Sequence, residues 1–95
     1  MLEDLDPLLH NQLRLKIVSL LMSVEYAEFN YLLEQTGASK GNLSVQISKL
    51  KKAGYINVEK SFRDNFPLTT CNISKSGIDA FEKYVKVINE YLKPG

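Results

Sequence analysis

Residues 29–54 read FNYLLEQTGASKGNLSVQISKLKKAG, and the order of the folded elements can be worked out from this stretch. Apolar Phe29, Leu32 and Leu33 recur at helical spacing at its start. Gly37 follows them and is suited to end a helix, because glycine adopts the left-handed C-cap conformation without a steric penalty. The pattern predicts a helix of about two turns that ends at Gly37.

A second helix begins after a short link, residues 37–39. Ser39 is a favoured N-cap, because its hydroxyl accepts a hydrogen bond from a backbone N–H of the first turn, and Gly54 is placed to close the helix. The apolar residues between them fall at spacings of 4 and 3: Leu43, Ile47 and Leu50. Two short helices joined by a tight turn with glycine indicate a helix-turn-helix over about 29–54, although any helical hairpin has the same pattern.

After Gly54 the apolar period changes from that of a helix to that of a strand. Residues 55–62 alternate apolar with polar side chains, which predicts a half-buried strand. Residues 63–67, RDNFP, contain the turn formers Asp, Asn and Pro, and residues 68–73 are rich in β-branched side chains. The sequence therefore predicts a β-hairpin over about 55–73, directly after the two helices.

One helical segment precedes this region and another follows it. Asp6 and Pro7 start the first, in which Asn11 is placed to cap a separate, longer helix. The last helix, about 75–93, follows the N-cap Ser74, and its apolar residues have the spacing of a heptad seam: Ile78, Phe81, Val85, Ile88 and Leu92. The order predicts a mainly α fold with a β-hairpin, a winged helix-turn-helix with a long C-terminal helix.

The apolar stripe of the last helix is wider than a small hairpin can cover, because Tyr84, Val87 and Tyr91 extend it. A core of this size buries only about 60 to 65% of the unfolded surface, so a second copy is a natural source of stability. We therefore expect a homodimer in which the last helix is the dimerisation helix. The predicted interface consists of Leu5, Leu9, Ile78, Phe81, Val85, Ile88 and Leu92.

Composition narrows the class of protein. A length of 95 residues, with 44% apolar and 24% charged residues, fits a single globular domain over 1–95. With one cysteine and one histidine, Cys71 and His10, the chain has too few ligands for a zinc site, and it has no Gly-rich phosphate loop. We expect no enzyme activity, no metal and no cofactor. An acidic start and the absence of a long apolar run predict a cytoplasmic protein that has no membrane partner.

The net charge of +1 hides an uneven distribution. Residues 1–38 sum to −4, residues 39–63 to +5 and residues 64–95 to zero. The positive charge therefore coincides with the second helix of the helix-turn-helix and the hairpin, where a nucleic-acid partner would be met.

Five segments carry a family resemblance: LDPLLH at 5–10, GNLS at 41–44, LKKAGY at 50–55, EKSF at 59–62 and PLTT at 67–70. In this order they resemble the small winged-helix transcriptional regulators related to the MarR and ArsR groups, over nearly the whole chain. The resemblance implies a homodimer on double-stranded DNA with a near-palindromic operator. It also implies a reading helix at residues 39–53 and a wing at 62–68, and some members respond to a small-molecule effector.

The helical wheel of the reading helix assigns the contacts, with Leu43, Ile47 and Leu50 turned inward. Base contacts are predicted for Lys40, Asn42 and Gln46, which offer hydrogen bonds, with Asn or Gln suited to adenine, and for Val45, which can touch a thymine methyl. Phosphate contacts are predicted for Ser39, Ser44, Lys49 and Lys60. Arg63 is the only cation in the wing and the candidate for a minor-groove or backbone contact.

Two features favour an alternative function, a winged helix that binds protein and not DNA. The total charge is nearly neutral, and Val45, Ser48, Phe66 and Leu68 occupy places where relatives commonly carry basic residues. Fewer cations predict a shallow salt dependence of DNA binding. For the other side chains we expect structural roles: Phe66 folds back over its neighbours, and Cys71 is a small buried hydrophobe.

Overall fold

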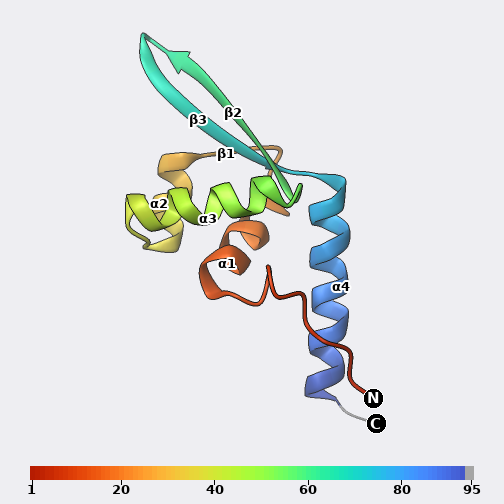
Figure 1. The fold of residues 1–95 in the computed structure, drawn as a ribbon. Coiled ribbons are helices and arrows are strands. Elements are labelled where there is room, and N and C mark those ends of the chain that lie inside the picture. The colour runs from red at the N-terminus through yellow and green to blue at the C-terminus, as the bar shows by residue number, and fades with distance from the viewer. Residues whose placement is uncertain (94–95) are drawn as a thin grey trace.

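Four helices and a three-stranded antiparallel sheet make up residues 1–93, the part of the chain that the computed structural model describes (Figure 1). In chain order the elements are α1 (Gln12–Leu21), β1 (Ala27–Glu28), α2 (Phe29–Thr36), α3 (Lys40–Lys52), β2 (Ile56–Arg63), β3 (Phe66–Ile73) and α4 (Lys75–Leu92). The strand order is β1-β3-β2. This is a winged helix-turn-helix with a long C-terminal helix, so the predicted fold is confirmed.

The N-terminal segment divides where the sequence predicts. The Asp6 carboxylate accepts a hydrogen bond from the Leu8 N–H at 2.9 Å, which closes a short turn ahead of α1. Asn11 then caps α1, because its Oδ1 accepts from the Arg14 N–H at 3.0 Å. The short strand β1 that follows α1 was not assigned from sequence, since two residues carry no readable period and pair only through β3.

The helix-turn-helix has the predicted caps. Gly37 ends α2 in the left-handed conformation, with φ 69° and ψ 14°, and its N–H donates to the Leu33 carbonyl. The Ser39 hydroxyl accepts from the Asn42 N–H at 3.1 Å and begins α3. Because both caps are made by local side chains or by backbone, the α2–α3 connection is specified by its own sequence.

The second strand of the hairpin is longer than predicted, and the first is displaced by one residue. Arg63 pairs with Phe66, so the connection is the two residues Asp64 and Asn65, with φ of 51° and 68°. Positive φ at both central residues is the geometry whose twist matches that of paired strands, and Asp and Asn tolerate it. The predicted five-residue turn is therefore wrong, and the strands extend into a wing that projects away from the helices (Figure 1). Phe66 does not fold back: it is 73% exposed.

The core lies between α1, α2, α3 and the base of the sheet. Its fully buried side chains include Ile17, Leu21, Leu32, Leu43, Leu50, Ile56 and Cys71. The expectation that Cys71 is a buried hydrophobe is confirmed, and burial raises the pKa of its thiol to about 11. Leu9 is also fully buried in this core, so the prediction that it contributes to a dimer interface is wrong.

Helix α4 packs against the rest of the chain through one side and leaves a neighbouring side partly uncovered. Gly77, Tyr84 and Val87 are buried against the chain. Of the predicted dimer seam, Ile78, Phe81 and Ile88 are half-buried, while Val85 is 40% and Leu92 72% exposed. The N-terminal segment lies along the same helix, where Tyr91 donates to the Glu3 carbonyl at 2.7 Å (Figure 1).

No helix within residues 1–93 is both long enough and apolar enough to cross a membrane.

Candidate nucleic-acid interface

The outer face of α3 is accessible along its length. Leu43, Ile47 and Leu50 point into the core, as the helical wheel predicts. Among the predicted contact residues of α3 and its N-cap, those with exposed side chains are Ser39, Lys40, Asn42, Ser44, Val45 and Lys49. Gly41 has open space at the position of a Cβ, and Val45 is 50% exposed, so the first two turns present a surface that a partner can approach closely.

A groove of about 370 Å³ separates α3 from the wing. Its lining is Phe29, Ser44, Ile47, Ser48, Lys51, Val58, Lys60 and Thr69. The polar members are three hydroxyls and two ammonium groups, all of them hydrogen-bond donors, whereas no carboxylate is among the lining residues that the structure places there. A donor-rich, positively charged groove is suited to a phosphate.

The groove brings together two of the predicted contact residues and three residues that were not predicted. Ser44 and Lys60, both predicted phosphate contacts, lie together in it. Sequence reasoning missed Ser48, Lys51 and Thr69. Ser44, Ser48 and Lys51 are spaced by 4 and 3 residues, which places them on one side of the helix. This spacing could have identified Ser48 and Lys51 from the sequence. Thr69 belongs to the groove only because of the strand register.

Gln46 does not lie where it was predicted. It is 9% exposed and turned toward α1, where its Oε1 accepts from the Arg14 guanidinium and its Nε2 donates to Asn42 Oδ1 at 2.9 Å. The prediction that Gln46 contacts a base edge is therefore wrong. Its amide is satisfied within the protein, because Arg14 from α1 offers a donor at the depth of the core.

Arg63 and Lys60 point to opposite faces of the wing. Side chains alternate along a strand, and the two residues are three positions apart. The Arg63 guanidinium makes a bidentate pair with Glu28, at 2.8 and 3.2 Å. The hydrogen bond from Arg63 lowers the pKa of the Glu28 carboxyl, and the same bond raises the pKa of Arg63. The one cation near the wing tip is therefore partly neutralised, and DNA would have to compete with Glu28 for it.

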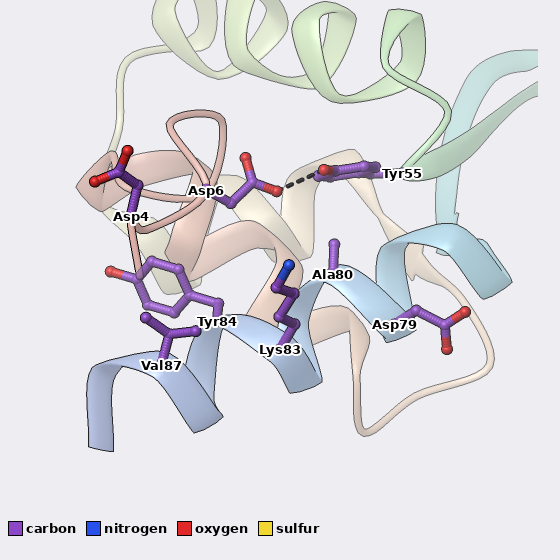
Figure 2. A pocket seen from close by; sticks show the side chains of 8 residues that line it. All are labelled: Asp4, Asp6, Tyr55, Asp79, Ala80, Lys83, Tyr84 and Val87. Atoms are coloured by element: carbon purple, nitrogen blue, oxygen red, sulfur yellow. Dashed lines mark hydrogen bonds between the residues drawn. The ribbon is translucent and has the colours of Figure 1, made fainter. Parts of the chain in front are cut away.

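A second hollow, of about 500 Å³, lies between the N-terminal segment and α4 (Figure 2). Its lining is Asp4, Asp6, Tyr55, Asp79, Ala80, Lys83, Tyr84 and Val87. Figure 2 shows the Tyr55 hydroxyl donating to Asp6; burial, together with this hydrogen bond, raises the pKa of Tyr55 to about 12. The lining has three carboxylates and one ammonium group, so this hollow disfavours a phosphate.

Within residues 1–93 there is no cluster of three or more His, Cys, Asp or Glu side chains that could hold a metal ion.

The model of the winged helix DNA-binding domain family matches residues 13–92. The chain belongs to this family. In winged helices of known DNA complexes the helix that corresponds to α3 enters the major groove, and the hairpin reaches the backbone or the minor groove. The resemblance of the sequence to small winged-helix transcriptional regulators is thus confirmed.

Other proteins share the sequence or the fold of this chain. An uncharacterized protein of Methanocaldococcus jannaschii is 36% identical over 80 residues, which cover 84% of this chain and 87% of that protein. The transcriptional regulator homologue of Pyrococcus horikoshii OT3 has a TM-score of 0.83 at 24% identity, over 90% of this chain and 84% of that one. PadR of Bacillus subtilis, solved in complex with operator DNA, has a TM-score of 0.71 at 13% identity, over 79% of this chain and 48% of PadR.

Proposed function

We propose that this winged helix is a transcriptional regulator that binds double-stranded DNA sequence-specifically as a homodimer. The observation that carries the proposal is the groove between α3 and the wing, with its three hydroxyls and two lysines. A phosphate in the groove would fix the register of α3, and the exposed residues of the first two turns would then face base edges. Family membership supports the same partner.

Electrostatics support this docking direction. The segment from residue 39 to residue 63 sums to +5, and Lys49, Lys51 and Lys52 lie in the last turn of α3. The N-terminus of α3 adds a partial positive charge, because the peptide dipoles of a helix align along its axis. The negative charge of the chain lies elsewhere, mainly in residues 1–38. A phosphate backbone would therefore be attracted to one face of the molecule.

The homodimer is proposed from the uncovered side of α4. Val85 and Leu92 are exposed and continue a half-buried apolar row, so the helix has surface that the single chain does not cover. A second copy that packs this row by a two-fold axis would place two reading helices on one duplex. Half-sites about 34 Å apart, one helical turn of DNA, would follow, with a near-palindromic operator. A small-molecule effector remains a prediction of the family resemblance.

The test is selection from random duplex DNA, followed by fluorescence-anisotropy titration of the selected duplex at several salt concentrations. We expect an enriched palindromic motif that binds more weakly as salt rises. The variant with Lys51→Gln and Lys60→Gln should bind more weakly, and its salt slope should fall by about 1.8, since each phosphate contact contributes about 0.9.

The matched control carries Lys86→Gln and Lys93→Gln, which remove the same charge from exposed positions at α4. Its affinity and salt slope should stay close to those of the unmodified protein. Equal losses in the two double variants would contradict docking in the groove, because they would point to net charge alone. The absence of any enriched motif would contradict sequence-specific binding.

A second candidate function, protein binding, is favoured by the wing tip. Phe62 and Phe66 are 76% and 73% exposed, and Arg63 beside them is paired with Glu28. The register places these two aromatic rings on opposite faces of the wing, and exposed aromatic side chains are typical of a protein contact. If Lys49→Glu together with Arg63→Glu leaves both the fold and the DNA affinity unchanged, protein binding becomes the better proposal.

A further inference from the structure

A chain of side-chain hydrogen bonds runs from α1 to the exposed face of α3. Arg14 is anchored first, because its Nε donates to the Leu8 carbonyl at 2.6 Å. Its Nη1 donates to Gln46 Oε1, and Gln46 Nε2 donates in turn to Asn42 Oδ1 at 2.9 Å. Asn42 is at the surface, in the first turn of α3, where the proposed function places a base contact.

The direction of this chain is dictated by chemistry. A guanidinium has donors and no acceptor, so the Gln46 amide must turn its oxygen toward Arg14. Its nitrogen then faces Asn42, and a nitrogen that only donates requires an oxygen opposite. The Asn42 amide therefore has one orientation, with Oδ1 inward and its two Nδ2 hydrogens free.

Burial and a cap make this orientation hard to reverse. Gln46 is only 9% exposed, and turning its amide around would set a nitrogen against the Arg14 guanidinium in a site with little water. A buried donor or acceptor without a partner costs more than an ordinary hydrogen bond contributes. The main chain of Asn42 is fixed as well, because its N–H donates to the Ser39 hydroxyl.

We propose that Arg14 and Gln46 are specificity-determining residues, which make Asn42 present hydrogen-bond donors to DNA. The inference rests on the proposed function, since it assigns a preference to the same DNA surface. Donors recognise base edges with acceptors, which in the major groove are N7 and O6 of guanine, O4 of thymine and N7 of adenine. Guanine and thymine present no amino group there, so they are the preferred bases for a side chain that only donates. The usual bidentate contact of Asn with adenine also needs the amide oxygen, which here is bonded to Gln46.

The decisive variant is Gln46→Glu, which keeps the shape of the side chain and replaces its donor nitrogen with an acceptor oxygen. Both carboxylate oxygens accept, and Arg14 beside them favours the ionised form. Asn42 must then donate Nδ2 to residue 46 and turn Oδ1 outward. At the operator position that depends on Asn42, the preferred base should change from guanine or thymine to one with an amino group in the major groove, cytosine or adenine. We expect a change in relative affinity of about ten-fold.

Two controls isolate this effect. Asn42→Ala identifies the operator position, and Gln46→Glu added to Asn42→Ala should cause no further change in preference there. Gln35→Glu adds the same charge at an exposed position of α2, so it should weaken binding to all sequences equally. A proton–nitrogen NMR spectrum of the side-chain amides gives a readout without DNA: the Asn42 signals of the Gln46→Glu variant should be shifted from those of the unmodified protein.

Should Gln46→Glu fail to fold, Arg14→Met provides a second route, because it removes the donor that orients Gln46. Both amides can then reverse, and the preference at the Asn42 position should weaken while the remaining motif persists. If the unmodified protein selects a motif and these variants keep its preference at the Asn42 position, the inference is overturned and the proposed function stands. If the unmodified protein selects no motif, both are overturned.

Discussion

The two hollows of this winged helix have similar sizes and opposite chemistry. The groove between α3 and the wing, about 370 Å³, is lined by Lys51, Lys60 and three hydroxyls. The hollow beside α4, about 500 Å³, has three aspartates and one lysine, Lys83, in its lining. A chain with a net charge of +1 thus separates its charges into a surface that attracts phosphate and one that repels it. Net charge alone is a poor guide to its partner.

The largest effect on this comparison should come from a glycine in the first turn of α4, where the helix meets Tyr55. A Cβ at Gly77 would come within 2.1 Å of the Tyr55 carbonyl oxygen, so Gly77→Ala must displace α4 and disturb the hollow beside it. We expect a loss of about 1 to 3 kcal/mol of unfolding free energy, measured by urea denaturation.

Gly41→Ala is the matched substitution in α3. There a Cβ meets nothing within 4 Å, and alanine favours a helix over glycine by up to about 1 kcal/mol. The stability of this variant should therefore be unchanged or higher. Equal destabilisation by both substitutions would mean that α4 is not held by the close approach at Gly77.

The next effect concerns the uncovered side of α4. Val85→Lys places a charge in the proposed dimer interface and should convert a particle of twice 10.8 kDa into a monomer in sedimentation equilibrium, because an unpaired charge is costly to bury. Lys86→Glu, at the adjacent exposed position, is the control and should leave the dimer intact. A monomeric unmodified protein would refute the proposed dimer at the outset.

A smaller effect is expected from Tyr55, which lines the hollow beside α4. The pKa of Tyr55 is raised from 10 to about 12, so the folded state holds this proton more tightly than the unfolded state. The resulting stability is fully present below pH 10 and is lost as the pH rises toward 12. Tyr55→Phe should lose less stability than the unmodified protein across this window, in denaturant titrations at matched pH. Parallel curves would contradict the raised pKa of Tyr55, whose causes are burial and the hydrogen bond to Asp6.

The smallest effect belongs to the outer face of the wing. Glu28→Gln releases Arg63 from an exposed ion pair, which contributes little to stability in physiological salt. The midpoint of thermal unfolding should hardly change at pH 7, whereas the affinity for DNA should rise by a few-fold at low salt. Reduced affinity would show that the pair with Glu28 places Arg63 for its contact.

Sequence reasoning succeeded for this chain wherever the cause is local. Caps at Ser39 and Ser74, the C-cap at Gly37 and the apolar periods between them depend on residues a few positions apart, so the helices and the hairpin could be predicted. The exposed contact residues of α3 followed from the same period. The family resemblance, based on short segments in a fixed order, pointed to the same fold.

Tertiary structure decided what depends on partners far along the chain. Gln46 is turned inward because Arg14, 32 positions away, offers a donor, and Arg63 is held by Glu28, 35 positions away. Thr69 lines the groove because the strand register places it opposite Lys60. Leu9 is buried because the segment ahead of α1 folds back over the core. A periodic pattern shows which side of an element is apolar, whereas hydrogen bonds and ion pairs are fixed only when two elements meet.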